Sequence, residues 1–162
     1  MDKYRRIEAD INLDNIRENI KQMKACVPKD MKMLAVIKAD AYGHGAIEVS
    51  RALDDLTDFY AVACIDEAVE LRNAGCKKPL LILGYTDASD YQELIEQDIR
   101  PAMYEKEQCQ ILSDAAAAKG LKAKIHIKMD TGMGRIGFPC DAAGIQDIVA
   151  ISTVSYTHLT LP

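Results

Sequence analysis

The sequence has no tryptophan, only two phenylalanines, and no apolar run that approaches the roughly 18 residues of a membrane-spanning helix. Three basic residues near the start, Lys3, Arg5 and Arg6, resemble the beginning of a secretory signal peptide. The polar residues Glu8 and Asp10 follow them, however, where a signal peptide needs an apolar segment. We therefore expect a cytoplasmic protein that does not bind membranes.

The sequence also has no excess of positive charge. Twenty lysines and arginines stand against 25 aspartates and glutamates, which gives a net charge of -5. An acidic surface argues against a nucleic-acid backbone as the main partner, because the phosphates would be repelled. A small anionic ligand stays compatible with this charge, since a single arginine can hold one.

The cysteines do not form a recognisable metal or redox motif. There are five of them, at positions 26, 64, 76, 109 and 140, and no pair has the Cys-x-x-Cys spacing. A zinc ribbon or a thioredoxin-like site is therefore not expected, and we expect no metal. Free thiols in a reducing compartment are the simplest interpretation of an odd number of scattered cysteines.

What the sequence does contain is a regular alternation of apolar runs and amphipathic segments. The 162 residues, 49% apolar and 28% charged, have the size and composition of about one globular domain. Short apolar runs predict five strands and periodic segments between them predict helices. The expected strands span residues 31–37, 59–65, 80–83, 99–103 and 121–130, and the expected helices span residues 13–27, 46–53, 66–74, 88–97 and 105–119.

This alternation predicts an α/β fold with a parallel sheet. The expected strands end near residues 38, 65, 83, 103 and 130, so consecutive ends are 18 to 27 residues apart. Two architectures agree with this spacing: a doubly wound open sheet, or the first five units of a (βα)8 barrel, which needs about 250 residues when complete. The alternating residues 6–13 predict a separate strand outside the series. In either architecture, functional residues lie at the carboxyl ends of the strands.

Lys38 is the first candidate functional residue. It directly follows the apolar run of the first expected strand, and the segment Ala39–Gly45 comes after it. A lysine amine at this end of a strand lies where functional groups are expected, and desolvation or nearby cations can lower a lysine pKa enough for Schiff-base chemistry. The alternative is a lysine that only marks the exit of the chain into solvent.

A second candidate region follows the fifth expected strand. On a strand, His126, Lys128 and Asp130 share one face, and this face is either the axial side of a barrel or the solvated side of an edge strand. The glycines at positions 132, 134 and 137 fit the Gly-x-Gly-x-x-Gly pattern. That pattern normally belongs to the first strand–helix unit of a dinucleotide-binding fold, so its late position argues against a nucleotide site.

Two long motifs resemble those of the bacterial alanine racemases. Residues 35–45 read AVIKADAYGHG, which is similar to the cofactor-lysine motif of that family, and residues 128–137 read KMDTGMGRIG, which is similar to its second motif. Residues 7–13, IEADINL, are similar to the opening strand of the family. The resemblance extends from about Tyr4 to Ile151.

The resemblance implies pyridoxal 5'-phosphate chemistry on a (βα)8 TIM barrel, of which this chain holds about the first five units. Lys38 would bind the cofactor as an aldimine and act as one of two catalytic bases. Tyr42 would lie near the cofactor phosphate, and Leu83 would line the pyridine ring. Arg135 would bind the phenolic oxygen of the ring and the substrate. Lys128 resembles the lysine that some members carry as a carbamate, whose negative charge would pair with Arg135.

The resemblance further implies an isomerase that interconverts L-alanine and D-alanine and supplies D-alanine for peptidoglycan. In the family, the second base is a tyrosine from the β-rich C-terminal domain of the partner subunit, so the full-length protein is expected to be a homodimer. We expect residues 1–151 to form an incomplete cofactor-binding barrel and residues 152–162 to be an atypical tail of foreign origin; the alternative is that Tyr156, Thr157 and His158 are the Tyr-Thr-His strand segment of the family. The 162 residues alone are expected to be inactive.

Two alternatives to an alanine racemase remain open from the sequence. One is a noncatalytic pyridoxal phosphate-binding barrel, like the single-domain homeostasis proteins. The other is a racemase for serine or another amino acid, because the residues that complete the substrate pocket in the family are not in this sequence.

Overall fold

The computed structural model describes residues 8–154 and 159–160. Lys3, Arg5, Arg6 and His158 lie outside the described residues. In chain order the elements are α1 (Leu13–Ala25), β1 (Leu34–Val36), α2 (Lys38–Gly43), α3 (Ala46–Ala52), β2 (Phe59–Val62), α4 (Ile65–Asn73), β3 (Leu80–Ile82), the 3-10 helix η1 (Ala88–Asp90), α5 (Tyr91–Glu96), β4 (Ile99–Met103), α6 (Lys106–Ala118), β5 (Ala123–Lys124), β6 (His126–Ile127), β7 (Met129–Asp130), β8 (Phe138–Pro139), α7 (Ala142–Val154) and β9 (Leu159–Thr160).

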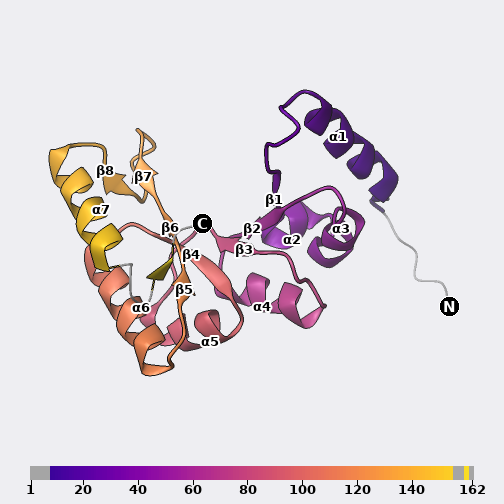
Figure 1. Ribbon diagram of the computed structural model, residues 1–162. Helices are drawn as coiled ribbons and strands as arrows, with labels where there is room; N and C mark the ends of the chain where they lie inside the picture. Colours follow the sequence, from indigo (N-terminus) through magenta and orange to yellow (C-terminus); the bar gives the residue numbers. More distant parts are fainter. Residues whose placement is uncertain (1–7, 155–158, 161–162) are drawn as a thin grey trace.

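Five strands form one parallel sheet in the order β1-β2-β3-β4-β6 (Figure 1). Within this sheet each strand pairs with the next member in chain order, and β5, between β4 and β6 in the sequence, pairs with β9 instead; Leu34 stands opposite Phe59, and Tyr60 stands opposite Leu80. A doubly wound sheet reverses its strand order at a switch point. The order here has no reversal, which is the arrangement of consecutive barrel strands.

The two faces of the sheet have different environments. On the outer face, Tyr60, Leu80 and Ile82 are fully buried, together with Leu71 and Leu94 of the covering helices. Burying one such side chain stabilises the fold by about 1.5–3 kcal/mol. On the inner face, the buried residues form a separate small cluster of Ala61, Leu81 and Ala102. The main core therefore lies between the sheet and its helices.

The inner face also carries polar and aromatic side chains. The rings of Phe59 and His126 meet edge to face with centroids 6.3 Å apart, and the Arg100 guanidinium lies 5.0 Å from the Phe59 centroid. His126 Nε2 and Arg100 Nε are both buried without a hydrogen-bond partner. This face thus contains two buried side-chain nitrogens without a hydrogen-bond partner among the described residues.

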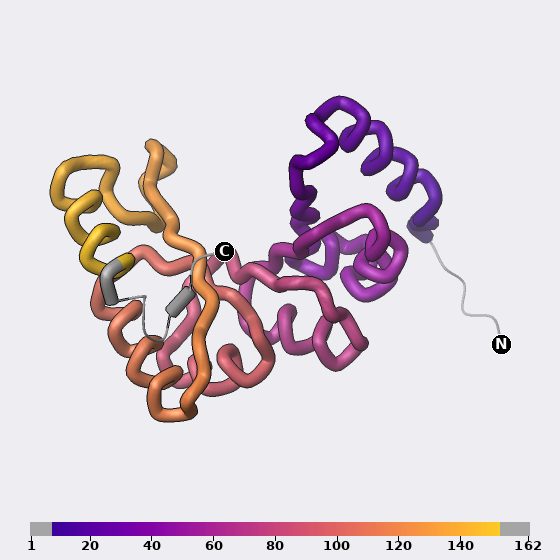
Figure 2. Tube along the Cα trace, in the orientation of Figure 1, coloured from indigo at the N-terminus to yellow at the C-terminus, as the bar shows by residue number. Residues whose placement is uncertain are grey.

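The fifth strand differs from the prediction. A continuous strand over 121–130 is wrong, because the segment divides into β5, β6 and β7, which pair with β9, β4 and β8 respectively. The backbone stays extended, but consecutive pieces turn to different neighbours (Figure 2). The separate early strand is also wrong within the described residues, since residues 8–12 form no strand and Leu13 already begins α1.

Local sequence explains where α1 begins. The Asn12 side chain caps it by accepting a hydrogen bond of 3.0 Å from the Asn15 amide. Asp14 in the first turn and Lys24 in the last complement the helix dipole. No helix in the described part of the chain is long and apolar enough to cross a membrane, and all five cysteines are free.

Candidate functional site

The carboxyl ends of three neighbouring strands border a cavity of about 200 Å3. Lys38, Ala63 and Leu83 follow the ends of β1, β2 and β3, and Gly84 comes next along the chain. Arg135 and Ile136 approach from the loop between β7 and β8. The cavity therefore combines one amine and one guanidinium with an otherwise apolar or backbone lining.

Gly84 permits a close approach between two strand ends. Its amide donates a hydrogen bond of 3.2 Å to the Ala63 carbonyl. A Cβ atom at position 84 would lie 2.5 Å from that oxygen, well inside van der Waals contact. Only glycine allows the chain to turn into the cavity at this point.

The segment after Lys38 has a left-handed backbone. Residues 39–42 have φ between 51° and 56°, although none of them is glycine. For L-residues this conformation costs roughly 1–2 kcal/mol each, so the surroundings must hold it. Asp40 Oδ1 accepts a bond of 2.7 Å from the Ala46 amide, and His44 Nδ1 lies 2.9 Å from the Ala41 carbonyl oxygen. These contacts fix the loop that leaves the lysine.

The loop that carries Arg135 is organised by one carboxylate. Asp130 Oδ1 accepts bonds of 3.0 Å from both the Gly134 and Gly132 amides. These backbone donors, that of Gly134 first, hold the pKa of Asp130 below its usual range. Gly137 closes the loop against β7, where a Cβ would lie 2.4 Å from the Asp130 nitrogen. The glycines thus shape a turn around a carboxylate and do not open a helix.

The structure brings together three of the residues selected from the sequence. Lys38 is half-buried, and Leu83 and Arg135 line the same cavity. Tyr42 is 62% exposed and does not line that cavity. Lys128 is half-buried, and its amide donates to Met103 O at 2.9 Å; no described hydrogen bond or ion pair joins its side chain to Arg135.

Other lining residues were not selected from the sequence. Ala63, Gly84 and Ile136 contribute small or apolar surface; Ile136 lies within the 128–137 motif but has no reactive group, and the other two lie outside both motifs. Only their location in the sequence could have identified them as site residues, because Ala63 and Gly84 lie beside strand ends, where this fold places functional groups. A rule based on position would have selected them, whereas a search for reactive side chains did not.

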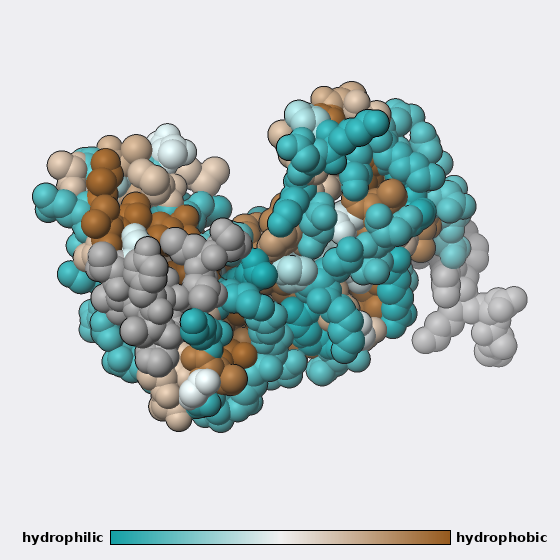
Figure 3. Space-filling view, in the orientation of Figure 1, coloured by the Kyte–Doolittle hydropathy of each residue, from teal (hydrophilic) through white to brown (hydrophobic). Residues whose placement is uncertain are grey.

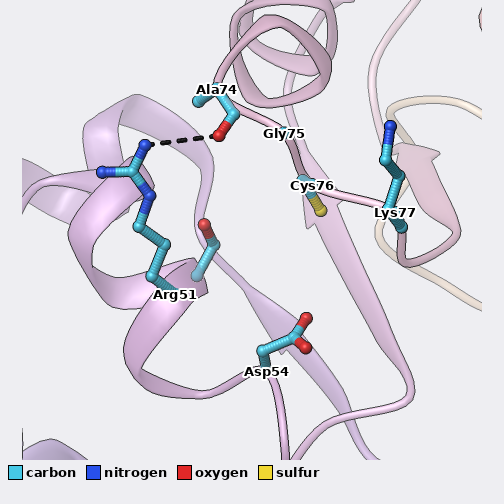
Figure 4. A pocket seen from close by; sticks show the side chains of 7 residues that line it. Arg51, Asp54, Ala74, Gly75, Cys76 and Lys77 are labelled. Atoms are coloured by element: carbon cyan, nitrogen blue, oxygen red, sulfur yellow. Dashed lines mark hydrogen bonds between the residues drawn. The ribbon is translucent and has the colours of Figure 1, made fainter.

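A larger cavity, of about 350 Å3, lies elsewhere in the molecule. Arg51 and Asp54 border it from the end of α3, and Cys76 and Lys77 border it from the segment that leads into β3 (Figure 4). Arg51 Nη2 donates to the Ala74 carbonyl at 3.3 Å. Because these residues precede β2 and β3, this cavity is at the amino-terminal ends of the strands, away from Lys38.

Comparison with known proteins places the chain in a family. The family model described as "Alanine racemase, N-terminal domain" matches residues 11–159. The chain belongs to the alanine racemase family. Alanine racemase 2 of Caldanaerobacter subterraneus subsp. tengcongensis is 44% identical over 138 residues, which are 85% of this chain and 36% of that protein. Alanine racemase 1 of Clostridium acetobutylicum is 41% identical over 152 residues, which are 93% and 39%.

Solved structures of the alanine racemase family have the same fold. Alanine racemase from Clostridium difficile 630 matches with a TM-score of 0.89 and 39% identity, over 93% of this chain and 39% of that one. Histidine racemase from Leuconostoc mesenteroides subsp. sake matches with a TM-score of 0.81 and 29% identity, over 92% and 39%. The chain thus spans about 40% of these relatives' length, and its fold is the corresponding part of a (βα)8 barrel.

Proposed function

We propose that this chain is the cofactor-binding part of a pyridoxal phosphate-dependent racemase that interconverts L-alanine and D-alanine. The observation that carries the proposal is the position of Lys38 at the end of β1, in one cavity with Leu83 and Arg135. The family membership and the names of its relatives support the same reaction. The expected cytoplasmic location and the supply of D-alanine for peptidoglycan are part of this proposal.

The lining of the cavity fits pyridoxal phosphate. Lys38 supplies the primary amine that the cofactor aldehyde needs, Leu83 supplies an apolar wall for a flat ring, and Arg135 supplies a cation for a phenolic oxygen. Tyr42 belongs to the left-handed segment that follows Lys38, and it would lie near the cofactor phosphate. When bound, the cofactor acts as an electron sink for the electrons left behind when the α-proton departs.

The protein's own groups then handle the proton. Lys38 Nζ would take the α-proton from one face of the substrate or return it there. Arg135 binds anionic oxygen and orients the substrate. A carbamate on Lys128, if formed, would place a negative charge on the element that leads into the Arg135 loop. Without it, both side chains are cations.

Racemisation needs a second base on the opposite face. Lys38 and Arg135 are the titratable residues that line the cavity, and an arginine does not give up its proton in proteins. We propose that a tyrosine from the partner subunit of a homodimer supplies this base. The 162 residues alone would then lack half of the proton-transfer machinery.

The test uses the full-length protein loaded with pyridoxal phosphate. Borohydride reduction followed by peptide mapping should find the pyridoxyl group on Lys38, and Lys38→Ala should abolish interconversion of the alanine enantiomers. Lys106→Ala, an exposed lysine at the start of α6, serves as the control and should retain activity. Labelling at another lysine would refute the assignment.

The substrate is tested in the same assay. One structurally similar protein is named a histidine racemase, whose substrate has a side chain larger than a methyl group. Alanine, serine and histidine should therefore be compared, and alanine should have the highest kcat/KM. Cofactor binding with no racemisation of any of them would instead favour the noncatalytic homeostasis class.

A further inference from the structure

Glu67 connects two backbone segments of the candidate site. It occupies the third position of α4 and is half-buried. Its Oε1 accepts a hydrogen bond of 2.9 Å from the Ala39 amide, and its Oε2 accepts one of 2.7 Å from the Ala63 amide. Both donors are adjacent to the cavity: Ala39 follows Lys38 directly, and Ala63 lines the wall.

The two bonds of Glu67 have different origins. A glutamate at the third helical position commonly reaches back to amides at the start of its own helix, which accounts for the bond to Ala63. The bond to Ala39 joins residues 28 positions apart in the sequence. Helix capping does not require it, because Ala39 belongs to a different element. Oε1 of Glu67 therefore binds the loop that follows Lys38.

The bond between Glu67 and the Ala39 amide is one of two hydrogen bonds that hold the backbone on either side of Lys38. On one side of the lysine, the Ile37 amide donates to the Ala61 carbonyl of β2 at 2.9 Å. On the other side, the Ala39 amide donates to Glu67. Ala39 is the first residue with left-handed dihedrals, φ 51° and ψ 50°. A carboxylate acceptor, which binds amides more strongly than a neutral one does, thus holds the strained peptide next to the lysine.

We propose that Glu67 is the positioning residue of the site: by holding the Ala39 and Ala63 amides together, it sets the direction in which the Lys38 side chain enters the cavity. This inference rests on the proposed role of Lys38 as the cofactor-binding residue. Glu67 contacts backbone and not the reacting atoms, so it acts through Lys38 and is not itself a catalytic residue.

Glu67→Gln tests the proposal with little change in shape. A glutamine has one acceptor oxygen and one donor nitrogen, so it can satisfy only one of the two amides. In the full-length protein we expect the affinity for pyridoxal phosphate to fall about tenfold, which corresponds to about 1.4 kcal/mol. We also expect a shift in the pH midpoint of the visible absorbance of the bound cofactor, because that absorbance reports the environment of the Lys38 Nζ linkage.

Glu70→Gln is the matched control. Glu70 lies one turn further along α4, is exposed, and undergoes the same change of charge. The proposal is overturned if both variants have the same cofactor affinity and the same spectral midpoint. Glu67→Asp keeps the carboxylate but shortens its reach, so it should recover the bond to only one amide and give an intermediate affinity. It also replaces Glu67→Gln if that variant does not fold.

The failure of this inference can be distinguished from failure of the proposed function. If borohydride labels Lys38 in the unsubstituted protein but Glu67→Gln behaves like Glu70→Gln, only the role of Glu67 is refuted. If the label lies on another lysine, the proposed role of Lys38 is refuted whatever the Glu67 variants do.

Discussion

At the scale of single residues, Asp130 links the fold to the candidate site. Its carboxylate accepts the Gly132 and Gly134 amides and so shapes the loop that brings Arg135 to the cavity. Asp130 itself is not among the cavity residues, and its effect on the site is through the backbone. Replacing it should therefore loosen the loop without removing a group that touches the ligand.

We predict that Asp130→Ala weakens pyridoxal phosphate binding by about tenfold, since two charge-assisted hydrogen bonds that order the loop are lost. The measurement is a titration of the full-length apoprotein with the cofactor. Asp114→Ala, on an exposed position of α6, is the control and should bind normally. Equal affinities for the two variants would show that the loop keeps its shape without Asp130.

His126 is the second residue for which we make a prediction, which concerns the pH dependence of stability. Burial, and then the nearby charge of Arg100, lower the pKa of its imidazole. The folded protein therefore keeps His126 neutral at a pH where the unfolded chain, with a histidine pKa of about 6.5, already binds a proton. Because the unfolded state binds more protons, stability falls as the pH decreases through about 6.5.

We predict that the urea midpoint of unfolding decreases between about pH 7.5 and about pH 5.5. His126→Gln should reduce this decrease, since glutamine does not titrate. The unsubstituted protein, measured over the same pH range, is the reference for this comparison. An unchanged dependence in His126→Gln would assign it to other groups.

At the scale of elements, α1 is held against α3 and the connection after it by polar contacts, together with the partly buried Leu13, Ile16 and Ile20. None of its residues is fully buried. Arg17 forms a two-pronged pair with Asp55, with Nη1–Oδ1 at 2.6 Å and Nη2–Oδ2 at 2.8 Å, and it also donates to the Ala52 carbonyl. Lys24 Nζ donates to the Leu56 carbonyl at 2.9 Å. The helix α1 should therefore be the first element to loosen when these charges change.

We predict that α1 loosens as the pH falls from about 4 to about 2. The hydrogen bond from Arg17 lowers the pKa of Asp55 to about 2. A lowered carboxyl pKa gives stability that is present above the ordinary value of about 3.9 and is lost on protonation. Hydrogen exchange should accelerate in α1 before α4, and Arg17→Ala should produce the same effect at neutral pH. Lys29→Ala, in the connection after α1, should not.

Much of the sheet could be predicted from the sequence. The strand at Ile99–Met103 has the expected bounds, although Arg100 interrupts its apolar residues. The first strand is shorter than expected and begins at Leu34, since Met31 is exposed and belongs to the connection. The left-handed turn of α2 was missed because it is built from ordinary residues, which leave no glycine signal in the sequence.

The candidate site was predictable to the extent that it follows strand ends. Lys38 and Leu83 satisfy that rule directly, and Arg135 belongs to a motif that follows the last strand of the sheet. The rule did not reveal Glu67, because its two bonds depend on how α4 lies against the lysine loop. Contacts between elements that are far apart in the sequence need the fold itself.

At the scale of the molecule, the sheet has an open side at β1. In the described residues β1 pairs with β2 alone, and Leu34 and Val36 are 37% and 41% exposed. An apolar cavity of about 320 Å3 lies beside it, between α1, β1 and α3. Apolar atoms also reach the surface at α7 (Figure 3), where Ile145 and Val149 are 52% and 57% exposed. An unpaired apolar strand edge favours association with other chains.

We predict that these 162 residues, produced alone, self-associate and do not racemise alanine. Sedimentation should show oligomers or aggregates, and a coupled oxidase assay for D-alanine should give no more turnover than a Lys38→Ala control. Replacing Leu34 and Val36 together by lysine should reduce the association, because charged edges resist strand pairing. A monodisperse and active monomer would contradict both the open edge and the need for a second base.

The strand order also determines when the site can form during synthesis. Because β1, β2, β3, β4 and β6 are neighbours in the order in which they are made, each new strand finds its partner already outside the ribosome. Lys38 is therefore synthesised nearly a hundred residues before Arg135. Only when Arg135 emerges does the cavity acquire its second cation. If the cavity binds pyridoxal phosphate as proposed, the cation for its phenolic oxygen is made only after the five strands of the sheet.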